Sequence, residues 1–174
     1  GKFVPNTTVA LFELGEAYQY FRLEIHLMVE NPERYFEDCK AVESKRVIFH
    51  FEATKNVENT LKEASKYEFQ KGIALNPETP ANAVRPFISK IDSVLSMCIH
   101  PGFQGRPFIP ETLKKIPEIR SMSAQILIGA DGGIKESNVE EVLKAGVDYA
   151  VIGSGIWQTP NPQETLRRLQ EMVK

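Results

Sequence analysis

Asp131 and His26 are the two residues whose types and settings could carry out chemistry. Asp131 follows an apolar run and precedes Gly132 and Gly133, and a carboxylate there could move a proton or bind a metal ion. An Asp before two glycines is also a common turn former that bonds its own backbone. His26 lies inside the apolar stretch 24–28, where a histidine is usually a core residue. As a metal ligand it needs a partner of suitable chemistry, and Asp131 is the only one the sequence offers.

Three glycine-bearing loops follow successive apolar runs, at 101–107, 131–133 and 153–155. Glycine lets backbone N–H groups approach an anion closely, although it is also the standard turn residue. Three such loops in succession favour a phosphate site over simple turns. The short segment after Gly153 could add a helix N-terminus, whose dipole favours a phosphate.

Two further histidines have no partner that the sequence identifies. His50 lies near the end of an apolar run and His100 begins the first glycine loop. We expect both to be structural or solvated rather than catalytic, because nothing in the sequence fixes a partner for either ring.

These residues need a scaffold, and the chain alternates between two kinds of segment. Short apolar runs rich in Val, Ile and Leu predict buried strands at 23–29, 46–51, 71–75, 93–99, 125–129 and 148–152. Helical spacing, proline starts and capping residues predict helices at 32–42, 57–67, 80–88, 110–119, 136–145 and 162–173. Asn31, Thr79 and Asn161 are the expected N-caps, and Gly146 is the expected C-terminal glycine.

Alternation without hairpin turns predicts parallel strands joined by helical crossovers. A doubly wound open sheet and a closed (β/α) barrel both fit this pattern. The absence of a GxGxxG motif after an early strand disfavours a dinucleotide fold. The candidate residues gather at the carboxyl ends of the strands, which is where a (β/α) barrel places its active site. No linker or low-complexity tract interrupts the sequence, so we expect one domain over residues 1–174.

Composition excludes several classes of protein. The 174 residues carry a net charge of −2, so no basic field points to nucleic acid. No apolar run approaches the roughly 20 residues of a membrane helix. Cys39 and Cys98 are isolated thiols, which favours a reducing compartment, the cytoplasm by default, over a disulfide.

The motifs, taken in order, resemble those of the ribulose-phosphate 3-epimerase family. The most specific are His-Leu-Met-Val at 26–29, Pro-Gly-Phe-x-Gly at 101–105 and Asp-Gly-Gly at 131–133. Further segments that resemble the family are 1–6, 49–53, 74–80 and 153–156. The resemblance covers essentially the whole chain, and it favours the barrel over the open sheet.

The resemblance implies a (β/α)8 TIM barrel of the ribulose-phosphate-binding type and an isomerase of the pentose phosphate pathway. Such an epimerase interconverts D-ribulose 5-phosphate and D-xylulose 5-phosphate. A proton leaves C3 and returns on the other face of an enediolate, which requires two acid/base groups. The family uses two His and two Asp to hold one divalent metal ion in each site, and Zn, Fe, Mn and Co all suit such ligands. Family members are commonly homo-oligomers.

Carried over by position, His26 and Asp131 are implied metal ligands, and Asp131 is also an acid/base group. Met28 and Met97 are implied walls of the site. Contacts with the substrate or its phosphate map to His26, Gly102, Phe103, Gln104, Gly105, Gly132, Gly133, Gly153 and Ser154. The loop at 101–107 is expected to fold over the ketose phosphate and exclude water.

The chain also departs from the family pattern. Gln104 stands where the family often has a second glycine, and His100 replaces a common acidic or amide residue. Family members carry a strand, a helix and a second strand before the Phe-Val-Pro-Asn loop, about 40 residues of a typical barrel. Those strands hold the other His and Asp, so six of eight strands are expected here. Segment 8–20 resembles the family's second helix. Three alternatives stay open: a ketose phosphate such as allulose 6-phosphate as substrate, a non-catalytic sugar-phosphate-binding fragment, and, more distantly, a hexulose-phosphate synthase.

Overall fold

A computed structural model describes residues 1–7, 9–103 and 105–173. Its centre is one sheet of six parallel strands. They are β1 (Glu24–Leu27), β2 (Arg46–His50), β3 (Gln70–Leu75), β4 (Ser93–Met97), β5 (Leu127–Asp131) and β6 (Tyr149–Val151). Their order in the sheet is their order in the sequence. A doubly wound sheet reverses its strand order at a switch point, so the open-sheet alternative is excluded and the predicted barrel-type architecture is confirmed.

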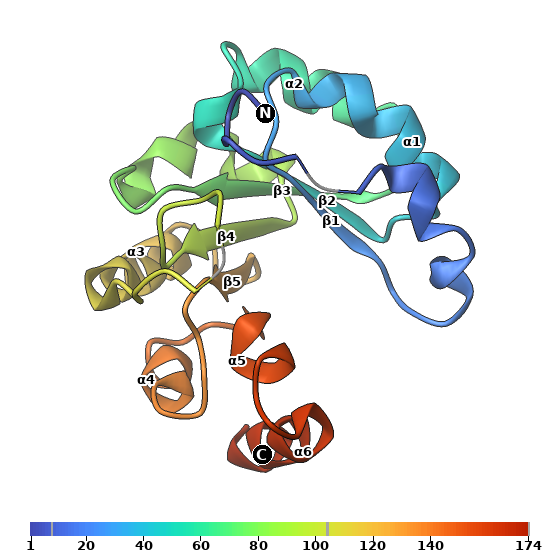
Figure 1. The fold of residues 1–174 in the computed structure, drawn as a ribbon. Coiled ribbons are helices and arrows are strands. Elements are labelled where there is room, and N and C mark those ends of the chain that lie inside the picture. The colour runs from blue at the N-terminus through green and yellow to red at the C-terminus, as the bar shows by residue number, and fades with distance from the viewer. Residues whose placement is uncertain (8, 104, 174) are drawn as a thin grey trace.

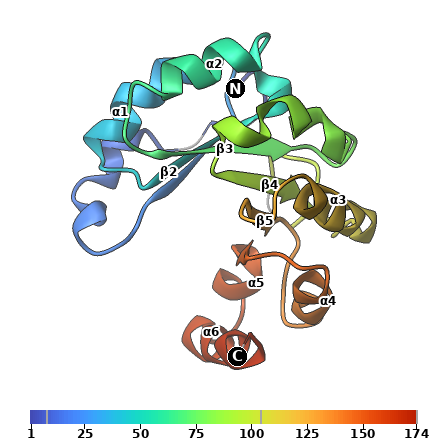
Figure 2. The same ribbon diagram turned by 180° about the vertical axis from the view of Figure 1, so that it is seen from behind.

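The sheet curls, and helices follow its outer side from α1 and α2 to α3 and α4 (Figures 1 and 2). The α-helices are α1 (Phe36–Ala41), α2 (Val57–Ala64), α3 (Lys115–Met122), α4 (Val139–Lys144), α5 (Ser154–Trp157) and α6 (Pro162–Met172). Short 3₁₀ helices are η1 (Leu11–Leu14), η2 (Ala17–Gln19), η3 (Pro32–Tyr35), η4 (Phe51–Ala53), η5 (Ala81–Lys90) and η6 (Pro110–Lys114). The result is a half-barrel with β1 and β6 as its outer strands.

The core has an outer and an inner part. Between sheet and helices, Leu61 of α2 and Ile116 of α3 pack with strand residues such as Val94 in one buried cluster. On the concave inner face, Ile48, Leu95 and other small or apolar side chains form a second cluster. Side chains alternate between the two faces along a strand. This alternation sets which residues point into the barrel, and those at the carboxyl ends of the strands would face its active site.

Several predicted helices are wrong in type or extent. Segment 80–88 is the 3₁₀ helix η5, which has Pro86 inside it, and a proline cannot donate the backbone hydrogen bond of an α-helix. The expected cap Thr79 instead donates its hydroxyl hydrogen bond to Glu52. Segment 8–20 contains only η1 and η2 in its described part, and Gly15 between them has a positive φ of 53°.

Of the residues predicted at helix ends, Asn161 and Gly146 are confirmed and Asn31 is not. Asn31 adopts a left-handed conformation and makes no side-chain capping bond, so that prediction is wrong. Asn161 does cap α6, because its side chain accepts a hydrogen bond from the Glu164 N–H. Gly146 follows Ala145, the C-cap of α4, and has a φ of 94°, as expected of a C-terminal glycine.

The structure also bears on the predictions about membrane helices and cysteines. Within the described part of the chain, no helix has the length and apolar character needed to cross a bilayer. Cys39 and Cys98 are both free thiols, as expected from their spacing, and both are buried.

Candidate active site

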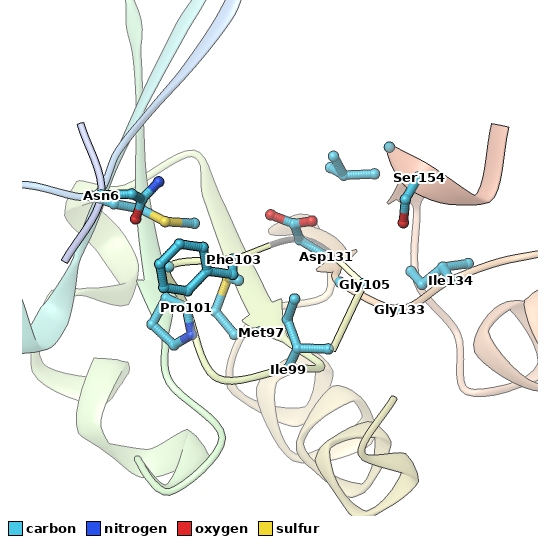
Figure 3. A pocket seen from close by; sticks show the side chains of 15 residues that line it. Asn6, Met97, Ile99, Pro101, Phe103, Gly105, Asp131, Gly133, Ile134 and Ser154 are labelled. Carbon is cyan, nitrogen blue, oxygen red and sulfur yellow. The ribbon is translucent and has the colours of Figure 1, made fainter. Parts of the chain in front are cut away.

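A pocket of about 370 Å³ opens at the carboxyl ends of the strands. The loops after β4, β5 and β6 supply most of its lining (Figure 3). Ten of the residues predicted for the site line it: Met28, Met97, Gly102, Phe103, Gly105, Asp131, Gly132, Gly133, Gly153 and Ser154. Gln104, also predicted, lies outside the described residues.

Asp131 ends β5 and sits at the centre of this pocket. Its carboxylate faces the open space, with Phe103 on one side and Ser154 on the other (Figure 3). Backbone pairing of Asp131 with Met97 of β4 and Val151 of β6 fixes its position. Its side chain is 20% exposed, so a bound molecule can reach a carboxylate that the sheet holds in place.

His26 does not line the pocket but lies directly behind Asp131. Its Nδ1 atom is 3.4 Å from Oδ2 of Asp131. The structure therefore brings together the two residues that the sequence could only pair by elimination. Their approach depends on the curl of the sheet, because they stand on β1 and β5.

His50 has a partner that the sequence did not indicate. Its Nε2 atom is 2.9 Å from Nε2 of His26, and its side chain is fully buried. In the register of β1 and β2, His26 lies opposite Ile48, so His50 is two residues further along the same inward face. Knowledge of this register would have revealed the contact.

Glu52 adds a fourth ionisable side chain to Asp131, His26 and His50. Its Oε2 atom is 3.4 Å from Nδ1 of His50, and its Oε1 atom accepts hydrogen bonds from the Asn76 N–H and the Thr79 hydroxyl. Burial alone would raise the pKa of Glu52, but its contacts with His50, Thr79 and Asn76 hold it below its ordinary value. Burial lowers the pKa of His50. Glu52 is therefore an anion beside a neutral imidazole.

Two glycines of the predicted phosphate loops are required by the backbone. Gly132 has a φ of 108°, and a Cβ atom there would overlap the Ile99 side chain. Gly155 lets α5 approach the loop after β5, since a Cβ atom would overlap the Ile134 carbonyl oxygen. The close packing brings Ser154, the first residue of α5, to the pocket. N–H groups in the first turn of a helix lack intrahelical partners and favour anions.

The walls of the pocket include residues that the sequence analysis missed. Met97 is buried and Met28 is half-buried, as an apolar wall requires. Asn6, Ile99, Pro101, Ile134 and Val151 also line the pocket. The Asn6 Oδ1 atom is buried and makes no hydrogen bond to a described residue. In the sequence, the Phe-Val-Pro-Asn segment is the only feature that could have indicated that Asn6 belongs to the site.

His26 and Asp131 have the chemistry of a partial metal site. An imidazole nitrogen and a carboxylate oxygen suit several divalent ions. Metal–ligand bonds of about 2.0–2.2 Å at a tetrahedral angle separate two ligand atoms by roughly 3.4 Å, and these two atoms are 3.4 Å apart. The described residues contain no cluster of three or more such ligands. The pair fits two positions around an ion.

His100 is on the surface, as expected. Its ring is 54% exposed and its Nδ1 atom lies 2.8 Å from Oε1 of Glu78. This exposed His–Glu pair does not line the pocket.

The fold and pocket define the class of protein, one of (β/α)-barrel type with a pocket at the carboxyl ends of its strands. Solved structures of similar fold include 3-hexulose-6-phosphate synthase from Salmonella typhimurium, with a TM-score of 0.72 and 13% identity over 92% of this chain and 77% of that one. Thiamine phosphate pyrophosphorylase from Pyrococcus furiosus gives a TM-score of 0.67 and 19% identity over 98% and 79%. Identities this low establish the fold alone.

Sequence similarity gives the family. The pattern of the Ribulose-phosphate 3 epimerase family matches residues 1–157. The ribulose-phosphate 3-epimerase of Schizosaccharomyces pombe is 31% identical over 99% of this chain and 78% of its own length. Those of Aquifex aeolicus and Escherichia coli K12 are each 32% identical over 99% of this chain and 81% and 80% of their own lengths. The chain belongs to the ribulose-phosphate 3-epimerase family, as its motifs predicted.

Proposed function

We propose that this protein interconverts D-ribulose 5-phosphate and D-xylulose 5-phosphate in the pentose phosphate pathway, by moving the proton on C3. One observation carries the proposal. The Asp131 carboxylate faces a pocket bordered by three glycine-bearing loops. Its volume of about 370 Å³ falls in the range of small-molecule sites. Family membership supports the same activity.

Asp131 acts as one acid/base group. Epimerisation requires such a group on each face of a planar enediolate, and Asp131 serves the face towards β5. As an anion it takes the C3 proton of the epimer whose C3–H faces β5, and an acid on the opposite face delivers the new proton. In the reverse direction Asp131 is the acid that returns a proton to its own face. Its place at the end of a paired strand limits its movement, which keeps the carboxylate within reach of the carbon.

The phosphate of the substrate binds between the loops after β5 and β6. Gly132, Gly133 and Gly153 offer backbone N–H groups, and Ser154 adds a hydroxyl and the start of α5. This arrangement matches the usual phosphate site of (β/α) barrels. Gly102, Phe103 and Gly105 belong to the loop that covers the bound sugar and excludes water.

His26 and Asp131 would hold one divalent ion beside the substrate. When bound, the ion would supply Lewis-acid stabilisation of the negative enediolate oxygens. Met28 and Met97 line the same region with apolar surface, and a water-poor wall strengthens electrostatic interactions. Buried Asn6 Oδ1 is free to accept a hydrogen bond from a sugar hydroxyl, since it has no partner among the described residues.

Carbon-13 NMR of labelled substrate tests this proposal. The protein, supplied with Mn²⁺ or Zn²⁺, is incubated with ribulose 5-phosphate. We expect the signals of xylulose 5-phosphate to appear until both epimers are at equilibrium. Conversion of allulose 6-phosphate alone would reject the assigned substrate. Binding of both sugar phosphates without conversion would reject the assigned activity.

A further inference from the structure

A row of four ionisable side chains runs from the pocket into the protein. Asp131 lies at the pocket, then come His26, His50 and Glu52, from β5, β1, β2 and η4. The three gaps between interacting atoms are 3.4, 2.9 and 3.4 Å. His50 and Glu52 do not line the pocket, so the proposed reaction gives them no direct part.

The two histidine rings meet edge to edge. Their planes are 13° from parallel and their centroids are 4.9 Å apart, whereas their Nε2 atoms are 2.9 Å apart. This nitrogen–nitrogen distance is that of a hydrogen bond. One Nε2 atom must therefore carry a proton and the other must accept it, because two bare lone pairs at this distance would repel each other.

Counting protons limits the row to two arrangements. Each neutral imidazole carries one N–H, so the two rings bring two protons to three gaps. The gap between the rings takes one of them. The second proton lies either between His50 and Glu52 or between His26 and Asp131, and the remaining gap is left with two facing acceptors.

Burial decides between these arrangements. Glu52 Oε2 is buried and makes no other hydrogen bond to a described residue, and His50 Nδ1 lies 3.4 Å from it. Asp131 is partly exposed at the pocket, where water or a bound ion can reach it. A buried acceptor without a donor costs more than an exposed one. The second proton therefore belongs between His50 and Glu52. The lowered pKa values of both groups agree with a neutral ring beside an anion.

We propose that Glu52 and His50 are positioning residues that fix the tautomer of His26. Glu52 holds the proton of His50 on Nδ1, so His50 Nε2 accepts the Nε2 proton of His26. Nδ1 of His26 is then left bare, facing Asp131 across 3.4 Å. Two facing acceptors at this distance form a place for a cation. The identity of that cation, a divalent ion, rests on the proposed function, whereas the tautomer does not.

Glu52→Gln is the sharpest test because it keeps the shape of the side chain. The Asn76 N–H and the Thr79 hydroxyl hold the oxygen of the new side-chain amide where Oε1 was, which turns its NH₂ group towards His50 Nδ1. The amide donates where the carboxylate accepted, so every hydrogen bond along the row reverses. His26 then carries its proton on Nδ1, and the cation site is blocked. Glu78→Gln is the matched control, since Glu78 pairs with exposed His100.

Nitrogen-15 NMR of labelled histidine identifies the protonated ring nitrogen without any metal. Spectra are recorded at alkaline pH, at which imidazole rings are neutral. We expect the proton on Nε2 of His26 in the wild type and in Glu78→Gln, and on Nδ1 in Glu52→Gln. A wild-type His26 protonated on Nδ1 would overturn the proposal even if no variant folds.

Metal affinity gives a second readout. Groups that orient a metal ligand typically change affinity about 10–100-fold when they are altered. We expect Glu52→Gln to weaken Co²⁺ binding by this factor, and Glu78→Gln to leave it unchanged. Equal affinity in all three proteins, despite a reversed tautomer, would reject the cation site. A protein with the expected tautomer but no epimerase activity would instead reject the proposed function and leave the positioning role intact.

Discussion

Nδ1 of His26 lies 3.4 Å from Oδ2 of Asp131, although the two residues stand on different strands, β1 and β5. The curl of the parallel sheet creates this proximity. It places an imidazole nitrogen behind a carboxylate that faces the pocket, and the proposed chemistry depends on this pair.

A first prediction concerns metal binding by the 174-residue chain. Two ligands rarely hold a divalent ion against water, and the described residues contain no group of three ligands. We therefore expect weak Zn²⁺ binding in calorimetry, weakened further by His26→Gln. A tightly bound stoichiometric ion, retained through dialysis, would contradict this account of the site.

A second prediction concerns Gly132. Gly132→Ala should destabilise the fold by about 2–4 kcal/mol, from a strained φ and overpacking against Ile99. It should also weaken binding of inorganic phosphate. Gly146→Ala is the matched control, because Gly146 has a similar positive φ but open space around its Cβ position. Thermal unfolding and phosphate titration would separate the two effects, and equal losses in both variants would show that contact with Ile99 is unimportant.

A third prediction concerns stability and pH. Burial lowers the pKa of His50 below its ordinary value of 6.5. As the pH falls below 6.5, the unfolded chain binds a proton that the folded chain does not. The free energy of unfolding therefore falls with pH, by up to about 1.4 kcal/mol per pH unit, until the folded pKa is passed.

Urea unfolding at several pH values measures this slope. Below pH 6.5, His50→Gln should reduce the slope of the unfolding free energy against pH by up to the contribution of one bound proton. His100→Gln removes an exposed histidine and should keep the wild-type slope. A slope that persists in His50→Gln would mean that another group causes the acid sensitivity.

A fourth prediction concerns the thiols. Burial, with a smaller contribution from Asp38, raises the pKa of Cys39 to about 12. Burial also raises the pKa of Cys98. Because the thiolate is the reactive form, neither cysteine should react with a thiol reagent in the folded protein at neutral pH. Both should react after denaturation in urea, and rapid labelling of the native protein would refute their burial.

The sequence predicted the strands well because buried parallel strands are continuous apolar runs. It placed the fifth strand at 125–129, whereas β5 spans Leu127–Asp131. The apolar pattern reports burial, but strand ends depend on pairing, and Asp131 pairs with Met97. Helix types were harder to predict, since Pro86 and Gly15 act through local backbone geometry.

The candidate site was predictable in its motifs but not in its contacts. The glycines of the three loops can be recognised in a sequence, and those predicted for the site and described in the structure line the pocket. The contact between His26 and His50 depends on strand register and sheet curvature. Neither quantity can be obtained from residue spacing, so His50 had no partner until the strands were placed.

Deuterium exchange at C3 tests the central claim, that Asp131 moves the C3 proton, most directly. Proton NMR in deuterated water follows the C3 signal of ribulose 5-phosphate and, separately, of xylulose 5-phosphate, with metal supplied. A base on one face exchanges the proton of one epimer even without net epimerisation. We predict exchange of at least one epimer by the wild type and a loss of about 10²–10⁴-fold in Asp131→Asn, with phosphate binding retained. Wild-type exchange by Asp131→Asn, or no exchange of either epimer by the wild type, would contradict the account.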